Sequence, residues 1–196
     1  MLLMGGGVVE NLPSGYTRLS YIESHGTEYI DTEFMPNQDT RAVFSIMFGG
    51  IPSEDAGCFG SRNNYQVEQF SLVFRRTGEL RFEYGNESPI AGILSVDNYY
   101  FIDMNKNSIV INGNSTNALY TAFQVKYPIL LFGIIDESSI YTTSVITRMM
   151  RCKIYDNGTL VRNFVPCKNS SGECGLYDLV EDKFHQNVGT GSFTGG

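Results

Sequence analysis

Glycoside hydrolysis needs two carboxylates that face one cleft, and the chain offers two places to look for such a pair. Alternation puts Glu79, Arg81 and Glu83 on one face of a predicted strand, opposite an apolar face. Because Arg81 lies between the two acids and the apolar face must point inward, we predict that this polar face is a solvated outer surface. Glu28 and Asp31 are an odd number of residues apart, so a strand would point them to opposite faces.

A hydroxyl or thiol nucleophile would need a base, and the chain has only 2 histidines. His25 falls in a predicted turn and His185 near the C-terminal end, so we expect both to be surface residues. The sequence contains neither a Gly-x-Ser-x-Gly elbow nor a phosphate-binding loop. Since the carboxylates do not form a pair either, we predict a protein that is not an enzyme.

Calcium is the one cofactor for which the sequence offers ligands, because Ca²⁺ takes about six or more oxygens from carboxylates and carbonyls. The candidate acids are Asp97, Asp103, Asp136 and Glu137. No segment carries the dense ladder of Asp and Asn that identifies a calcium loop, so we expect ordinary turn residues. Whether any metal binds is left open.

The 4 cysteines give no zinc motif. Cys58 and Cys152 lie in apolar strand patterns, which predicts buried thiols. Cys167 and Cys174 are separated by a longer interval than zinc-binding pairs use, so two alternatives remain, a disulfide and two incidental thiols.

Non-covalent binding is the remaining chemistry, and loops between strands are where it concentrates. The chain has no Trp, so stacking on a sugar would fall to tyrosines, each of which equally fits packing within a strand. These tyrosines are Tyr65, Tyr99, Tyr100, Tyr120 and Tyr141. The polar loops 61–64 and 136–139 are the better candidates for exposed contacts. The predicted ligand-binding residues at the loop rim are Arg62, Asn63, Asn64, Tyr65, Asp136 and Glu137.

The composition describes the scaffold that must position these loops. In 196 residues there are 12 Tyr, 13 Phe and 21 Gly, which is typical of strands joined by tight turns. A formal net charge of −7 repels phosphate backbones, so we do not expect nucleic-acid binding. No apolar stretch reaches the length of about 18 residues that a membrane span needs, so we expect no membrane partner.

Alternation of apolar and polar residues predicts an all-β fold without helices. The clearest hairpin has strands 148–155 and 160–165 around an Asn-Gly turn. The segment 21–30 is predicted to be a second hairpin, and the apolar run 127–135 a single strand buried on both faces. Other predicted strands are 40–48, 70–75, 80–84, 98–104 and 108–111. Strands at this spacing predict a single sandwich or barrel.

Two segments then suggest a family. Residues 12–32 contain LPSGYTRLSYIES and GTEYIDT, and residues 153–184 contain KIYDNGTLVRNFVPC and GLYDL. Both resemble the opening and closing signatures of concanavalin A-like, laminin G-like domains, which include lectins. The resemblance implies an all-β, antiparallel two-sheet β-sandwich of jelly-roll type over residues 12–196, preceded by a flexible leader or anchor at residues 1–11. These motifs are structural and mark how the first and last strands pair.

The family resemblance also implies a function. Such domains occur in phage and prophage minor structural proteins and in surface proteins of gut bacteria. The residues 1–11 lack the basic and apolar regions of a signal peptide, which favours a non-catalytic virion component such as a tail, fibre or capsid-decoration protein. It would assemble in the host cytoplasm and bind a host cell-surface glycan or other virion proteins within a multivalent assembly. The alternative is a bacterial cell-surface or secreted carbohydrate-binding adhesion module; a glycoside hydrolase is a third reading.

Overall fold

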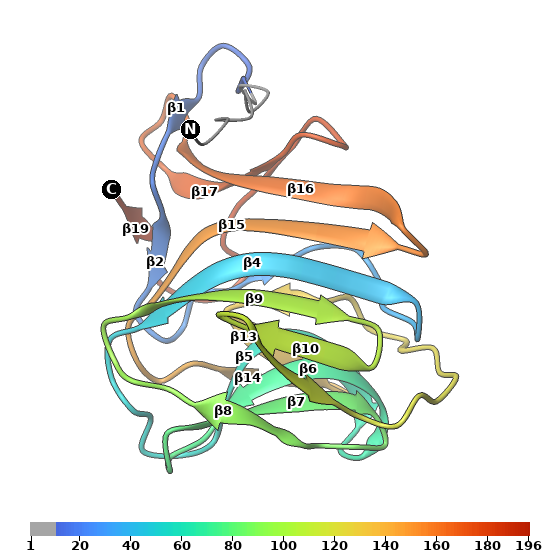
Figure 1. Cartoon of the computed structure of the whole chain (residues 1–196). Coiled ribbons are helices and arrows are strands. Elements are labelled where there is room, and N and C mark those ends of the chain that lie inside the picture. Colours follow the sequence, from blue (N-terminus) through green and yellow to red (C-terminus); the bar gives the residue numbers. More distant parts are fainter. Residues whose placement is uncertain (1–10) are drawn as a thin grey trace, which may run out of the picture.

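The computed structural model describes residues 11–196, which form two sheets packed face to face in an all-β sandwich (Figure 1). No helix occurs in this part of the chain, and so it contains no helix that could cross a membrane. The predicted leader or anchor at 1–11 lies outside the described residues except for Asn11.

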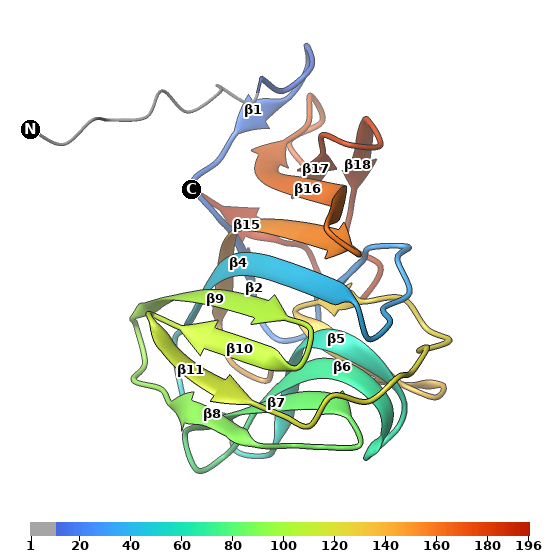
Figure 2. The same cartoon turned by 45° about the vertical axis from the view of Figure 1, so that its right-hand side comes forward.

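The larger sheet has 11 strands, and its main path runs from the edge strand β11 to the edge strand β18 (Figure 2). In order along this path the strands are β11 (Asn114–Asn117), β10 (Ser108–Ile111), β9 (Tyr99–Asn105), β4 (Thr40–Phe48), β15 (Thr147–Asp156), β16 (Thr159–Lys168), β17 (Cys174–Asp178) and β18 (Lys183–His185). Off this path, β1 (Thr17–Arg18) pairs with β16, while β2 (Ile22–Ser24) pairs with β15 and β19 (Thr194–Gly195). The opening and closing motifs therefore meet in one sheet.

The smaller sheet has 8 strands. Its main path runs through β14 (Ser139–Thr142), β13 (Gly133–Asp136), β5 (Ala56–Asn64), β6 (Val67–Phe74), β7 (Glu79–Gly85) and β8 (Ile90–Ile93). The short strand β12 (Leu130–Leu131) joins β5 to β3 (Ile30–Asp31). Strand pairs in both sheets are antiparallel, with β5–β13 as the parallel exception.

The core lies between the sheets and is rich in phenylalanine. Phe44 of β4 stacks on Phe59 of β5 with ring centroids 4.5 Å apart, and Phe48 of β4 meets Phe74 of β6 at the same separation. Phe44, Phe48 and Phe74 come from faces that alternation in the sequence marked as apolar, whereas Phe59 lies on β5, which the sequence did not predict as a strand. Their burial joins the two sheets, because each fully buried aromatic removes a large apolar area from water.

Most predicted strands are confirmed. The 40–48 strand is β4, and the Asn-Gly hairpin is β15–β16, with Asn157 and Gly158 both at positive φ (46° and 82°) as its turn requires. Cys58 and Cys152 are buried free thiols, as predicted. Cys167 and Cys174 are also free thiols, so no disulfide joins them in this structure.

Two predictions of local structure are wrong. The run 127–135 is not one strand, because Phe132 adopts a positive φ of 67° and reverses the chain between β12 and β13. The segment 21–30 is not a hairpin, because β2 joins the larger sheet and β3 the smaller one. The turn between them is closed by Glu28, whose carboxylate accepts hydrogen bonds from the His25 amide and the Ser24 hydroxyl.

Candidate functional site

The two polar loops singled out in the sequence lie side by side in the structure. Parallel pairing of β5 with β13 sets Asp136 opposite Arg62, although more than 70 residues separate them in the chain. Arg62 and Asp136 form an ion pair of 2.9 Å, and the Asn64 amide donates to the Glu137 carboxylate at 3.0 Å. Four of the predicted rim residues thus form two polar pairs across this junction.

Arg62 also joins the rim to the centre of the smaller sheet. Its guanidinium contacts both carboxylate oxygens of Glu83 on β7, at 3.0 and 3.1 Å, and lies 5.3 Å from the centroid of the Tyr65 ring. Arg62 therefore lies between two carboxylates, those of Glu83 and Asp136, and beneath an aromatic ring. This arrangement fixes the side chain of Arg62 in one orientation.

Glu83 corrects an expectation, since it is not on a solvated surface. It is 1% exposed and accepts a hydrogen bond of 2.5 Å from the Ser71 hydroxyl. Burial raises the pKa of the Glu83 carboxyl, and the attraction of Arg62 opposes that rise. The alternation of β7 was predicted correctly, but the face that carries Glu83 is covered by the Arg62 side chain.

Asn63 fastens the rim through several hydrogen bonds. Its side-chain oxygen accepts a hydrogen bond of 2.7 Å from the Lys126 amide, and its side-chain nitrogen donates to the Gln124 carbonyl and to Glu68. These bonds hold the segment before β12 against the end of β5.

Next to the Arg62 junction the outer face of the smaller sheet is hollowed to a volume of about 330 Å³. The residues around the hollow include Arg62, Tyr65, Val73, Arg81, Glu83 and Tyr141. Val73 of β6 and Ile134 of β13 also line the hollow, but both are nearly buried, so they offer it little apolar surface. Tyr65 and Tyr141 are 44% and 46% exposed, so each ring presents a large open surface.

Gly57 shapes this hollow by letting the β13–β14 hairpin approach β5. A Cβ atom at Gly57 would lie 2.7 Å from the Tyr141 carbonyl oxygen and 2.9 Å from the Ile134 nitrogen. Any larger residue would push the hairpin away from the sheet. The wall that carries Tyr141 therefore depends on a glycine at this position.

Asp55, Arg75 and Arg81 are charged residues of the hollow that were not among the ligand-binding candidates from the sequence, and Arg81 has the fewest contacts of the three. The sequence placed Arg81 on the polar face of its strand, but the pattern did not indicate which polar face would form a hollow. Its guanidinium contacts the Tyr65 hydroxyl at 3.5 Å, and its buried Nε has no hydrogen-bond partner.

The four acids considered for calcium do not converge. Asp103 is engaged by Arg41 through two hydrogen bonds of 2.8 and 2.6 Å, while Asp136 pairs with Arg62 and Glu137 with Asn64. A calcium ion needs its oxygens gathered at one point, so these residues do not fit one.

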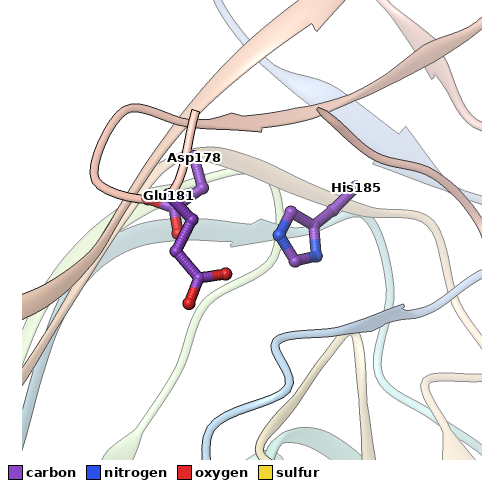
Figure 3. Close-up of side chains that lie close together, drawn as sticks. All are labelled: Asp178, Glu181 and His185. Carbon is purple, nitrogen blue, oxygen red and sulfur yellow. The ribbon is translucent and has the colours of Figure 1, made fainter. Parts of the chain in front are cut away.

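A different cluster gathers metal-ligating groups, and it lies at the end of the larger sheet. Asp178 of β17, Glu181 and His185 of β18 bring their ligand atoms within 4.8 Å of one another (Figure 3). His185 is 5% exposed, which overturns the expectation of a surface histidine. Its Nδ1 lies 3.0 Å from the Asp31 carbonyl oxygen, so Nδ1 carries the proton, and its buried Nε2 has no partner.

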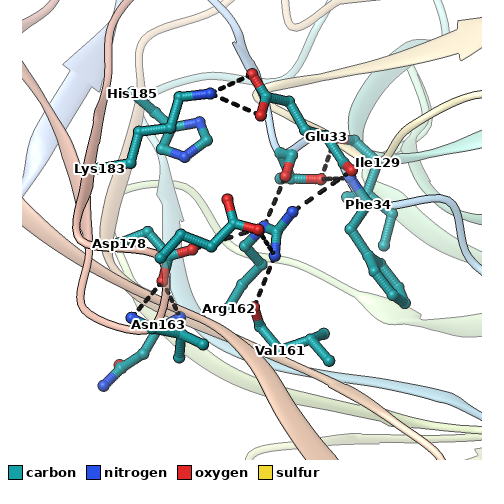
Figure 4. Close-up of polar contacts among 12 residues, drawn as sticks. Glu33, Phe34, Ile129, Val161, Arg162, Asn163, Asp178, Lys183 and His185 are labelled. Carbon is teal, nitrogen blue, oxygen red and sulfur yellow. Dashed lines mark hydrogen bonds and ion pairs between the residues drawn. The ribbon is translucent and has the colours of Figure 1, made fainter.

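Arg162 supplies the positive charge of this cluster. Its guanidinium contacts Glu181 at 2.7 Å and Asp178 at 3.6 Å (Figure 4). It also donates to the carbonyl oxygens of Thr32 and Val161, both at 2.8 Å, and of Glu33 at 3.4 Å. A divalent cation between the same carboxylates would be repelled by this guanidinium, so the cluster does not fit a metal site.

In comparisons with protein-family models and with curated proteins, no family and no curated protein matched the chain. The geometry of the molecule therefore carries the functional argument.

Proposed function

We propose that this chain is a non-catalytic carbohydrate-binding domain, and that the hollow between β13–β14 and the outer face of β6–β7 is its binding site. One observation carries the proposal: two half-exposed tyrosines line one hollow together with arginine and carboxylate groups. A sugar ring has an apolar face that packs on aromatic or aliphatic surface and hydroxyls that donate and accept hydrogen bonds. The volume of about 330 Å³ is at the small end for ligand pockets, which suits one or two sugar rings.

The carboxylates of the hollow support binding rather than hydrolysis. Hydrolysis needs a scissile bond between two carboxyl groups, whereas Arg62 lies between Glu83 and Asp136. Both acids are thereby engaged by one guanidinium. We expect no increase in reducing ends when the protein is incubated with any glycan that it binds.

The setting that we propose for this domain is a virion, where many copies would bind a host glycan together. The proposed kinship with laminin G-like jelly rolls supports it, because β1 and β16, from the two resembling motifs, pair at Thr17–Lys168 and Arg18–Cys167. Repetition on a particle would raise avidity even if each hollow binds weakly. Immunogold labelling should find the protein on particles; labelling of the bacterial envelope instead would support the surface adhesion module.

A glycan array and a whole-cell binding assay test the binding function. We expect saturable binding that Tyr141→Ala weakens by about tenfold, the loss of one stacked aromatic contact. Tyr99→Ala is the matched control, because Tyr99 is also 44% exposed but lies on β9 of the other sheet. Equal loss in both variants, or no binding to any glycan or cell, would contradict the proposal and favour contact with a neighbouring virion protein.

A further inference from the structure

The arginines of the hollow differ in how their charges are balanced. Arg62 contacts the carboxylates of Glu83 and Asp136, as described above. Arg75 contacts those of Asp55 at 2.9 Å and Glu79 at 3.2 Å. Within residues 11–196, no carboxylate lies within ion-pair distance of Arg81. Arg81 is therefore the cation of the hollow that is left without a counter-ion.

The nearest acids in sequence do not fill this role. Glu79 and Glu83 are the residues on either side of Arg81 on the same face of β7. Glu79 is bound to Arg75, and Glu83 is bound to Arg62 and the Ser71 hydroxyl. Both carboxylates are thus turned toward other donors.

The hydrogen-bonding capacity of Arg81 is also unused. A guanidinium has five N–H donors in a planar fork. The one contact of Arg81 is the 3.5 Å approach to the Tyr65 hydroxyl, at the limit of a hydrogen bond, and its buried Nε donates to nothing. Because Nε is closed to solvent, a ligand would reach Arg81 through its Nη groups, of which Nη1 has only the long contact to the Tyr65 hydroxyl and Nη2 has no partner among the described residues.

We propose that the hollow binds a glycan that carries an anionic group, either the carboxylate of an acidic sugar or a sulfate ester, and that Arg81 is the anchor for that group. This inference rests on the proposed carbohydrate binding and names the class of sugar. The planar fork of Arg81 donates to the anion, the Tyr65 hydroxyl gives a further donor, and the sugar ring lies against the exposed Tyr141 side chain.

The charges in and around the hollow favour a ligand that carries a single anionic group. The lining includes three arginines, Arg62, Arg75 and Arg81, and two carboxylates, Asp55 and Glu83. The whole chain nevertheless carries −7, so an extended polyanion would be repelled outside the hollow. One anionic sugar residue fits this field, whereas a nucleic-acid backbone does not.

Matched glycans test the inference. The full chain is assayed on an array that carries uronic-acid oligosaccharides beside their carboxyl-reduced counterparts, and sulfated oligosaccharides beside their desulfated counterparts. The same array is probed with Arg81→Gln, which keeps a donor and removes the charge. Arg151→Gln is the control, because Arg151 is an exposed arginine on β15 of the other sheet.

We expect one anionic series to bind at least about tenfold more tightly than its neutral counterpart, because hydrogen bonds to an ionised group are stronger than neutral ones. That preference should disappear in Arg81→Gln and persist in Arg151→Gln. Which series binds identifies the anion as a carboxylate or a sulfate. An unchanged melting temperature of Arg81→Gln shows that the lost preference is not unfolding.

Three results would overturn the inference, and they differ in whether the proposed carbohydrate binding survives. Equal binding of anionic and neutral glycans would refute the role of Arg81 and leave the carbohydrate-binding function intact. The same holds if the anionic preference survives in Arg81→Gln. Binding to no glycan at all would refute both the proposed function and the inference.

Discussion

Two groups of arginines and carboxylates lie at different places in this sandwich, and they differ in what the guanidiniums leave free. Arg162, at the end of the larger sheet, engages all three of its nitrogens with three backbone carbonyls and with Glu181 and Asp178. In the hollow, Arg62 and Arg81 each keep a buried Nε without a partner. These bonds mark Arg162 as a structural residue, whereas the unpartnered donors beside the half-exposed tyrosines support our proposal that the hollow binds a ligand.

The residues joined by Arg162 explain its structural role. It binds β16 and the β17–β18 turn to the segment at Thr32 and Glu33, which leads from β3 to β4. Lys183 of β18 adds an ion pair with Glu33. The cluster thus fixes a peripheral hairpin to the part of the chain that crosses between sheets. The ion pairs of Arg62 in the hollow, in contrast, join only strands of the smaller sheet, β5 to β7 and β13.

Loss of Arg162 should therefore have the largest effect on stability. Arg162→Leu would leave Asp178, which is 0% exposed, as a buried carboxylate without its cation. We expect a loss of about 3–5 kcal/mol in the free energy of unfolding, measured by urea titration. Arg81→Gln should change it by less than about 0.5 kcal/mol, because Arg81 has no ion-pair partner to lose. Similar losses in the two variants would erase the distinction between the clusters.

Gly57→Val should have the next largest effect and should couple stability to binding. The new side chain would overlap the Tyr141 carbonyl and the Ile134 backbone, which forces the β13–β14 hairpin outward. A destabilisation of about 1–3 kcal/mol and loss of glycan binding are expected. Gly92→Ala in β8 is the control, since a Cβ there meets nothing within 4 Å and φ is not positive; both properties should be unchanged.

The pH dependence of stability should have opposite signs for one acid in each region. Glu83 in the hollow has its pKa raised above 4.5 by burial, so its contribution to stability is present below that pH and is lost as pH rises through its folded-state pKa. Glu33 near Arg162 has its pKa lowered below 4.5 by the hydrogen bond from Lys183. Its contribution is present above 4.5 and is lost as pH falls through its folded-state pKa.

Urea titrations from acid to neutral pH measure this difference with Glu83→Gln and Glu33→Gln. Relative to the native chain, Glu83→Gln should gain stability as pH rises above 4.5. Glu33→Gln should become relatively more stable as pH falls below 4.5, where the native chain loses the contribution of its ionised carboxylate. The same sign in both variants would contradict the assignment of burial to one acid and of an ion pair to the other.

Lys183→Gln should have a smaller effect than Arg162→Leu or Gly57→Val. The Lys183–Glu33 pair lies at the surface, with side chains about half exposed, so solvent screens it. We expect a change of about 0.2–1 kcal/mol in unfolding free energy, decreasing as salt is added. A larger, salt-independent loss would mean that the hairpin depends on Lys183 rather than on Arg162.

Local patterns in the sequence predicted the strands well, because alternation and Asn-Gly turns depend only on neighbouring residues. They predicted β4 and the β15–β16 hairpin within three residues at each end. They failed at 127–135, where Phe132 adopts a backbone conformation that its residue type disfavours. They also failed at 21–30, because no local signal shows that a chain changes sheets.

The site was only partly predictable. Loops 61–64 and 136–139 were recognised as polar, but their contact depends on a parallel pairing between distant segments. The burial of Glu83 and of His185 depends on Arg62 and on the segment around Asp31, which cover them in three dimensions. In the sequence, Arg81 looks like any other charged residue on the outward face of a strand. Its position in the hollow depends on the β13–β14 hairpin, which a local pattern does not reveal.

A single NMR titration tests the contrast between the two arginine clusters most directly. The Nε–H signals of Arg81 and Arg162 are followed in one sample of the full chain while methyl glucuronide, and separately a sulfated monosaccharide, is added. We predict a saturable shift of the Arg81 signal with at least one of these sugars, and no shift for Arg162, whose Nε–H already donates to the Thr32 carbonyl at 2.8 Å. A shift of Arg162 with Arg81 unmoved would contradict the assignment of the hollow as the binding site.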